Sequence, residues 1–215
     1  DQARRRNCPR ADVSFILLEC GGAFSAAIAV ADGRIVDGMG GSSGPLGLRA
    51  VGALDGEVAY LAGTITKDML FTGGAASIVG DPNHVLDRIA DPRNARDQMA
   101  RDALIEGAVK AAAAMAAIMP RPHEILLSGR ATHREALARE LRLRLSPIAP
   151  ARRLDGFARV ATEAAQGAAL IADGLAGGPN ERLVDTMGLR EAGGTVLDHL
   201  FVVSPDAARA RLGIA

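Results

Sequence analysis

Residues 15–41 constrain the fold more than any other part of the chain, because short apolar segments alternate there with glycine-rich turns. Phe15 to Leu18 carry no polar side chain, which predicts a buried strand. Ala23 to Val30 predict a second strand and Arg34 to Asp37 a third, because Asp32-Gly33 between them is a turn pair that accepts positive φ. The stretch therefore predicts three antiparallel strands at the start of the fold.

The turn after the first strand has the composition of an anion-binding loop. Glu19 and Cys20 are followed by Gly21 and Gly22. Without Cβ atoms, these glycines let backbone N–H groups approach a phosphate closely, and we expect Gly22 to have a positive φ. Glu19 could hold a metal-bound water or a nucleophile. The alternative is that the glycines merely turn the chain.

Composition narrows the classes of partner. The chain has 215 residues, of which 48% are hydrophobic, so it can bury a core and amounts to one large domain or one domain with an appendage. It has 25 basic and 25 acidic residues, so no net charge favours nucleic acid or an anionic membrane. Cys8 and Cys20 can form neither a disulfide framework nor a four-cysteine zinc site, which favours a reducing cytoplasm.

Helix signals dominate from residue 55 onward. Asp55 has the position of an N-cap before DGEVAYLAG. Asn94 to Met119 form the longest helical segment, and Pro120 and Pro122 are expected to end it. Its inward residues are expected to include Met99, Ala103, Val109, Ala113 and Ala116.

A strand, a turn and a helix follow. Glu124 to Ser128 predict a short buried strand, and Gly129-Arg130 a turn into a helix. Thr132 and Glu135 have capping-box spacing. A helix from Glu163 onward is expected to end at Gly177-Gly178. The order of elements predicts an α/β fold of ribonuclease-H-like type: a three-stranded antiparallel start, then βα units and a helical C-terminal part.

With these turns placed, the chain resembles the second domain of the superfamily that unites acetate and sugar kinases, heat-shock chaperone ATPases and actin. ECGGAFSAAIAVADGRIVDGMGG, GALDGEVAYL and EAAQGAALIADGLAGG, in this order, resemble more closely an uncharacterised family described as predicted butyrate kinases. The resemblance implies a second, C-terminal actin-like ATPase domain at 14–203. Residues 1–13 are then a disordered leader or fragment end, and residues 204–215 a tail.

The resemblance also implies ATP and Mg²⁺ as cofactors. The residues that it implies for nucleotide binding are Gly21, Gly22, Gly40, Gly41, Ser128, Gly129, Arg130 and Glu163. Those implied for catalysis are Glu19, Asp55 and Glu57, with Glu19 and Asp55 also holding the metal. Because the turns after Glu19 and Ser128 must reach one nucleotide, we expect them at the same edge of one sheet.

Plainer interpretations stay open for several of these residues. Asp55 could act only as a helix cap, and Gly129 could form an ordinary turn. Glu163 and Gln166, one helical turn apart, could face the nucleotide or lie on a solvated face. The four histidines, which are His84, His123, His133 and His199, have no metal-ligand spacing and are expected to be surface or cap residues.

Two departures from the resemblance matter. Leu54 stands where acetate and butyrate kinases carry an arginine that stabilises the transferring phosphoryl group, and Arg49 or Arg130 are the candidates to replace it. The first domain of the superfamily has no counterpart before residue 14.

We therefore expect the ATP-binding half of a phosphotransferase acting on a small carboxylate, with a missing N-terminal domain as partner and a homodimer left open. The alternative is a non-catalytic nucleotide-binding or assembly module that keeps the actin-like fold. Neither nucleic acid nor membrane is an expected partner.

Overall fold

The computed structural model describes residues 2–119 and 121–213. The chain divides into two compact units, Asp1–Leu170 and Ile171–Ala215, and the sheet belongs to the first. No helix in the described residues has the length and apolar character that crossing a bilayer requires.

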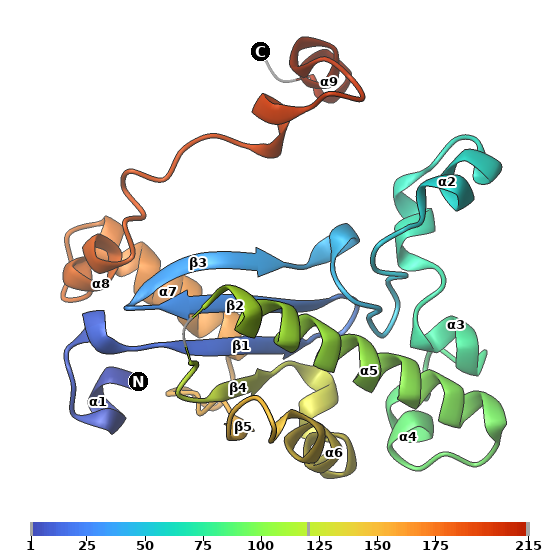
Figure 1. The fold of residues 1–215 in the computed structure, drawn as a ribbon, viewed down its shortest axis with the longest axis horizontal. Helices are drawn as coiled ribbons and strands as arrows, with labels where there is room; N and C mark the ends of the chain where they lie inside the picture. Colours follow the sequence, from blue (N-terminus) through green and yellow to red (C-terminus); the bar gives the residue numbers. More distant parts are fainter. Residues whose placement is uncertain (1, 120, 214–215) are drawn as a thin grey trace. The chain divides into compact units, whose positions relative to one another are not determined.

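A five-stranded sheet with the strand order β3-β2-β1-β4-β5 organises the first unit (Figure 1). The strands are β1 (Phe15–Cys20), β2 (Ser25–Ala31), β3 (Arg34–Met39), β4 (Ile125–Ser128) and β5 (Ala151–Arg153). β1 pairs antiparallel with β2, and β2 with β3, whereas β1–β4 and β4–β5 are parallel. The predicted α/β fold with an antiparallel start is confirmed.

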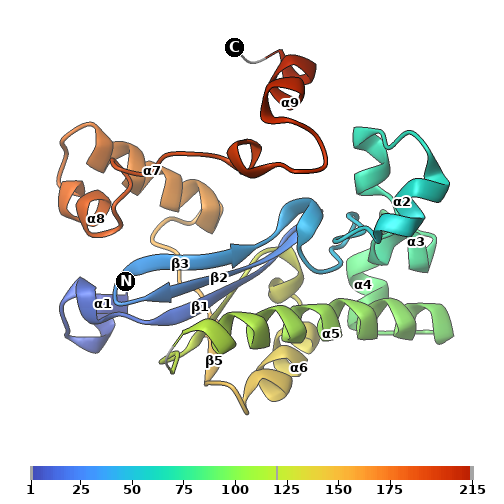
Figure 2. The same ribbon diagram turned by 45° about the horizontal axis from the view of Figure 1, so that its top comes forward.

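Helix α5 (Ala95–Ile118) packs along β1 and β2 on one face of this sheet, with α6 (Glu135–Leu145) beside it (Figure 1, Figure 2). Ile16, Leu18 and Cys20 alternate along β1 as its buried residues, which is the period of a strand with one covered face. Asn94 caps α5 by accepting hydrogen bonds from the N–H groups of Arg96 and Asp97. Pro120, expected to end this helix, lies outside the described residues.

The predicted inward face of α5 is partly wrong. Met99 is 60% exposed and Ala113 is exposed, and Ala103 is half-buried, whereas Val109 and Ala116 are half-buried and pack against the core. The buried residues are Asp97, Ala100, Leu104, Ile105, Ala108, Ala111, Ala112 and Met115. Alanines occur all round this helix, so its sequence contrasts little between the inner and outer faces, and the pattern of larger side chains misleads.

The predicted capping box before α6 is also wrong. Thr132 is buried, and its hydroxyl donates to the carbonyl of Gly129 at 2.8 Å. It thereby stabilises the short helix η4 (Arg130–His133), and Arg134 occupies the N-cap of α6 without a side-chain cap. Thr132 therefore belongs to the turn after β4 and not to the start of α6, to which the sequence pattern assigned it.

The first unit contains further short helical segments. They are α1 (Gln2–Arg6), η1 (Arg10–Asp12), η2 (Gly41–Ser43), α2 (Gly56–Ala62), η3 (Lys67–Phe71), α3 (Ala75–Val79), α4 (Val85–Ala90) and the start of α7 (Glu163–Leu175).

The disorder expected for the leader is wrong for residues 2–13. This segment forms α1 and η1, and it lies against the β2–β3 turn, where the N–H of Gly33 donates to the carbonyl of Val13 at 2.8 Å. Arg5 also pairs with Asp155 at 2.6 Å. A short, charged stretch of sequence does not indicate a backbone hydrogen bond or an ion pair to residues far away in the chain.

The second unit contains the end of α7, α8 (Glu181–Thr186), η5 (Val196–His199) and α9 (Pro205–Leu212). The predicted stop of α7 at Gly177-Gly178 is confirmed: Gly177 has φ +80°, and the N–H of Gly178 donates to the carbonyl of Asp173 at 2.8 Å. Arg190 donates to the Gly174 carbonyl at 2.8 Å, which satisfies another carbonyl at this helix end.

Candidate functional site

The two predicted motif turns leave the sheet at the same edge. β1 and β4 run parallel, with Glu19 opposite Ser128, so Gly21 and Gly129 follow their strands on the same side (Figure 1). The expectation of a shared edge is confirmed. In α/β sheets, ligands bind outside the carboxyl ends of parallel strands, which makes this edge the place for a site.

A row of paired residues extends this edge across the sheet. Ser128 of β4 lies opposite Glu19, and Glu19 lies opposite Ala26 of β2. A Cβ atom built on Gly40 would lie 2.8 Å from the Cβ of Ala26, so the loop after β3 passes close to the same row. Gly41 follows with φ +60° and nothing within 4 Å of its Cβ position. Four strands therefore bring the separate glycine motifs to one edge.

Gly129 joins the two motifs by direct backbone contact. It has φ +89°, and a Cβ atom there would lie 2.4 Å from the carbonyl oxygen of Cys20. Neither the conformation nor the space accepts a side chain. Gly129 is thus required for the junction of β1 and β4, whatever it contributes to a ligand.

Gly21 and Gly22 form the turn between β1 and β2, which closes with a hydrogen bond from the Gly21 N–H to the Phe24 carbonyl at 3.0 Å. The positive φ expected at Gly22 is wrong, because neither glycine belongs to the residues with positive φ. A Cβ on Gly21 would lie 2.9 Å from the Phe24 oxygen, so this position serves the turn. The three atoms nearest to a Cβ on Gly22 would all belong to the Arg130 side chain, with its Cδ at 3.4 Å.

The side chain of Arg130 and the backbone of Arg49 lie beside this turn. The Arg130 side chain covers Gly22, is exposed, and makes no ion pair or side-chain hydrogen bond with the described residues. The backbone N–H groups of Arg49 and Ala50 both donate to the carbonyl of Ala23 at 3.1 Å. A bare glycine beside the guanidinium of Arg130 suits a group with negative charge.

The acidic member of the row is Glu19, which is half-buried. The hydroxyl of Ser128 approaches its Oε2 at 3.5 Å, a long contact that leaves the carboxylate oxygens open to a cation. Burial, and secondarily the charge of Glu19, raise the pKa of the neighbouring Cys20 thiol to about 12. Cys20 is therefore a protonated core residue and not a nucleophile.

Asp55 acts as the cap of α2. Its Oδ1 accepts from the N–H groups of Glu57 at 2.9 Å and Val58 at 3.2 Å, and Glu57 is exposed on the first turn. Throughout residues 2–119 and 121–213, no group of three His, Cys, Asp or Glu side chains is arranged to hold a metal ion. The structure thus gives Asp55 a helix-capping role, while Glu19 is the predicted metal ligand that lies at the strand edge.

Glu163 is tied to the segment that follows Gly129. Its Oε1 lies 3.8 Å from Nε2 of His133, the last residue of η4, and Nδ1 of His133 lies 3.0 Å from an Arg153 nitrogen on β5. Sequence reasoning missed His133 and Arg153, because β5 is only three residues long and contains two arginines. No pattern in so short and charged a segment indicates a strand.

Gln166 holds the loop before α7. It is buried, accepts from the N–H groups of Phe157 and Ala158, and donates to the carbonyls of Ala158 and Ala161. These contacts satisfy both ends of the amide, so neither a nucleotide contact nor a solvated face applies to this residue.

Residues 1–202 match the model of a family described as "Protein of unknown function (DUF1464)". The chain belongs to this family. No curated protein matches it.

Solved carboxylate kinases share the fold of this DUF1464 chain. A propionate kinase from Francisella tularensis subsp. tularensis SCHU S4 matches 72% of the chain with a TM-score of 0.60 and 15% identity. An acetate kinase from Entamoeba histolytica matches 67% of it with a TM-score of 0.58 and 14% identity. An acetate kinase from Porphyromonas gingivalis matches 68% with a TM-score of 0.59 and 15% identity.

At these identities the likeness shows the fold alone. The match covers 41%, 49% and 40% of the Entamoeba, Francisella and Porphyromonas chains, so the chain spans less than half the length of each. The predicted relationship to acetate kinases is confirmed as a shared fold, and the likeness to butyrate kinases stays a prediction.

Proposed function

We propose that the chain is the nucleotide-binding part of an ATP-dependent phosphotransferase whose acceptor is a small carboxylate. The observation that carries this proposal is the shared edge of β1 and β4, where the turns that contain Gly22, beside Arg130, and Gly129 follow two strands that run side by side. The fold shared with acetate and propionate kinases supports the choice of reaction.

In this proposal, different residues bind different parts of the nucleotide. The turn at Gly22 accepts the terminal phosphates, and Arg130 beside it neutralises their charge. The adenosine lies along the Gly129 turn, close to His133 and Glu163. Arg49, next to the turn at Ala23, is the second source of positive charge. It takes the place of the arginine that acetate and butyrate kinases carry where this chain has Leu54.

Mg²⁺ would fit this edge as an ion carried by the phosphates, which needs only one or two protein carboxylates. Glu19 would hold it, and the ion would neutralise charge on the β- and γ-phosphates. In the reaction, an oxygen of the acceptor carboxylate forms a bond to the γ-phosphorus while the bond to the β,γ-bridging oxygen breaks. The products are an acyl phosphate and ADP, and the balance requires no further reactant.

A second candidate function is a nucleotide-binding or assembly module without turnover. Leu54 favours it, because its side chain lines an apolar pocket instead of supplying a guanidinium. Asp55 favours it too, because one of its oxygens is used by the cap of α2. Both functions require nucleotide at the same edge, so they differ in turnover and not in the place of binding. The cytoplasmic location implied by two unpaired cysteines stays a prediction.

Backbone NMR of the 215-residue chain with millimolar Mg-ATP tests the site. The amide signals of Gly22, Gly129 and Arg130 are expected to shift together, while the signal of Gly80, at the end of α3, serves as a remote control. Shifts confined to other regions, or none at all, would refute the proposal. Production of an acyl phosphate by the protein joined to its predicted N-terminal domain separates the enzyme from the binding module.

A further inference from the structure

β3 forms an open edge of the sheet. It is the outermost strand in the order β3-β2-β1-β4-β5, so one side of its backbone has no partner strand in the described part of the chain (Figure 1, Figure 2). Residues 34–38 are all exposed, among them Ile35 at 50% and Val36 at 51%. An exposed edge strand with apolar side chains is a template for pairing with a strand of another chain.

A β-bulge in β3 brings two opposite charges to the same face of the sheet. Asp37 lies opposite Ala29 of β2. Three residues earlier, Arg34 lies opposite Ala31, so Val36 is the extra residue of the bulge. Ala29 and Ala31 are two residues apart and share a face of β2, and directly opposite residues lie on the same face. Arg34 and Asp37 therefore share a face, which residues three apart in an unbroken strand do not.

Both charged groups are available to a partner. Arg34 is exposed and has no ion pair or side-chain hydrogen bond within residues 2–119 and 121–213. Asp37 is also exposed, and its Oδ1 accepts from the N–H of the next residue, Gly38, at 2.7 Å, which leaves Oδ2 open. The strand thus carries one positive and one negative group on one face, with two exposed apolar residues between them.

We propose that β3 pairs antiparallel with β3 of a second copy of the chain, about a two-fold axis between Ile35 and Val36. Arg34 of each copy then lies opposite Asp37 of the other, which forms two ion pairs on one face of the joined sheet. Between these ion pairs, Ile35 of one copy packs against Val36 of the other. Opposite charges directly across from each other stabilise strand pairing, and like charges destabilise it. A parallel pair in register would bring each charge against its own kind, so this order of charges selects the antiparallel arrangement.

The proposed contact is small and independent of the nucleotide edge. Pairing along six residues stays below the roughly 1,200 Å² of stable complexes, so we expect a weak, reversible dimer. β3 runs in the same direction as β1, because both are antiparallel to β2. The two-fold axis therefore directs the proposed nucleotide edges of the two copies to opposite ends of the joined sheet. Association should not depend on Mg-ATP.

Sedimentation velocity of the 215-residue chain at about 0.01–1 mM tests the pairing, and a reversible equilibrium between monomer and dimer is expected. Arg34→Asp and Asp37→Arg should each weaken the dimer about tenfold or more, because each creates two like-charged pairs across the axis. The double variant Arg34→Asp/Asp37→Arg exchanges the charges and should restore the dimer. Melting curves check that each variant is folded.

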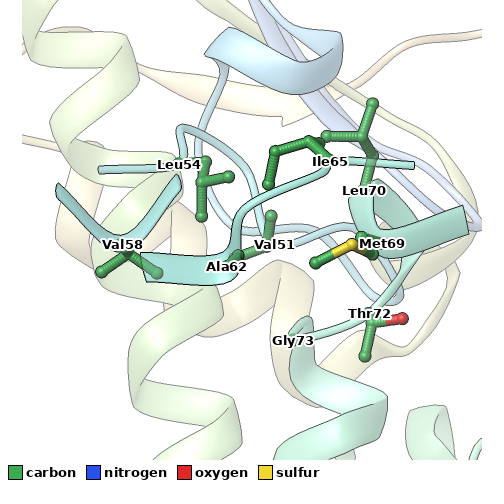
Figure 3. A pocket seen from close by; sticks show the side chains of 9 residues that line it. All are labelled: Val51, Leu54, Val58, Ala62, Ile65, Met69, Leu70, Thr72 and Gly73. Carbon is green, nitrogen blue, oxygen red and sulfur yellow. The ribbon is translucent and has the colours of Figure 1, made fainter. Parts of the chain in front are cut away.

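A matched pair of valine variants distinguishes β3 from a second exposed apolar surface of the first unit. That surface surrounds the apolar pocket between α2 and η3, where Figure 3 shows Val58 among the lining side chains. Val36 and Val58 are both 51% exposed. Val36→Lys should weaken the dimer, because a lysine on an edge strand opposes pairing, and Val58→Lys should leave it unchanged.

A monomer over the whole concentration range would overturn the proposal, as would a dimer that Arg34→Asp leaves intact or a double variant that stays monomeric. A dimer lost in Val58→Lys and kept in Val36→Lys would assign the contact to the surface around α2 and would also overturn it. The proposed function is judged separately. NMR shifts at Gly22 and Gly129 with Mg-ATP but no dimer would refute the pairing alone, and a dimer without these shifts would refute the proposed function alone.

Discussion

Gly22 and Gly129 are the same residue type in two different physical settings. Gly129 has a positive φ, and a Cβ atom there would meet the Cys20 carbonyl, whereas Gly22 has no positive φ, and the three atoms nearest to its Cβ position belong to the flexible side chain of Arg130. We therefore expect substitutions at Gly129 to report on the fold and substitutions at Gly22 to report on the proposed ligand.

Replacing Gly22 by Val is expected to weaken Mg-ATP binding by about tenfold or more, or 1.4 kcal/mol, because the branched side chain occupies space beside Arg130. The free energy of unfolding should change by no more than about 0.5 kcal/mol, as at other surface positions. Nucleotide titration and urea unfolding of both proteins check this.

Gly129→Ala provides the contrast. Its backbone conformation alone should destabilise the protein by about 1–3 kcal/mol, and the contact with Cys20 should add to that. If Gly22→Val lowered stability as much as Gly129→Ala, Gly22 would serve the fold and the phosphate site would lie elsewhere.

Asp97 is a fully buried carboxylate whose contribution to the stability of the fold depends on pH. Arg88 Nε donates to its Oδ2 at 2.8 Å, Arg88 Nη2 lies 2.8 Å from its Oδ1, and the Arg93 N–H donates to Oδ2 at 3.1 Å. The hydrogen bond from Arg88 holds the pKa of the Asp97 carboxyl below its ordinary value of 3.8, although burial acts in the opposite direction.

Because the folded state binds this proton less readily than the unfolded state, Asp97 stabilises the protein above pH 3.8 and loses that effect as the pH falls through the lowered pKa. Asp97→Asn should therefore lower the Tm at neutral pH and flatten the fall of Tm in acid. Melting curves at several pH values check this. Asp81, Glu106 and Asp198 also have lowered pKa values and leave residual pH dependence, so parallel acid profiles for both proteins would contradict the prediction.

At the scale of elements, α5 gives a direct test of the corrected inner face. Leu104 is 2% exposed and Met99 is 60% exposed, although both are large apolar residues of the same helix. Leu104→Ala should lower the free energy of unfolding by about 2–5 kcal/mol through the lost contacts and the cavity. Met99→Ala should change it by about 0.5 kcal/mol or less. Urea denaturation distinguishes them, and equal losses would show that α5 is rotated.

Much of the fold could be predicted because each element carries its own local signal. The apolar run before Glu19, the Asp32-Gly33 turn and the cap Asp55 depend on neighbouring residues, and the structure has strands and a helix there. The β5 strand and the fold of residues 2–13 depend on partners far away in the chain, which no local pattern contains.

The candidate site divides in the same way. The glycine turns are recognisable in the sequence, and the parallel pairing of β1 with β4 brings them to one edge. Arg153 and the contact between His133 and Glu163 were missed, because they follow from a strand of three residues. The sequence allowed two roles for Asp55, as a helix cap or as a catalytic residue and metal ligand. The structure shows the cap of α2.

At the scale of the whole molecule, the chain spans less than half of the acetate and propionate kinases that share its fold. We expect the 215-residue chain alone to bind Mg-ATP only weakly and to transfer no phosphate to carboxylates, since an opposing domain would supply further phosphate contacts and exclude water. Calorimetry and an ADP-release assay check this. Tight binding by the chain alone would contradict the picture of a shared cleft.

The contact of Gly129 with the Cys20 carbonyl also sets when the site can exist during synthesis. The turn at Gly22 leaves the ribosome more than a hundred residues before Gly129 does. At about 5–20 residues per second, that delay is on the order of ten seconds. During this delay, the side of β1 that will pair with β4 has no partner strand. The nascent hairpin then carries only one of the two turns that form the proposed site. The proposed site is therefore completed late, when β4 inserts beside β1.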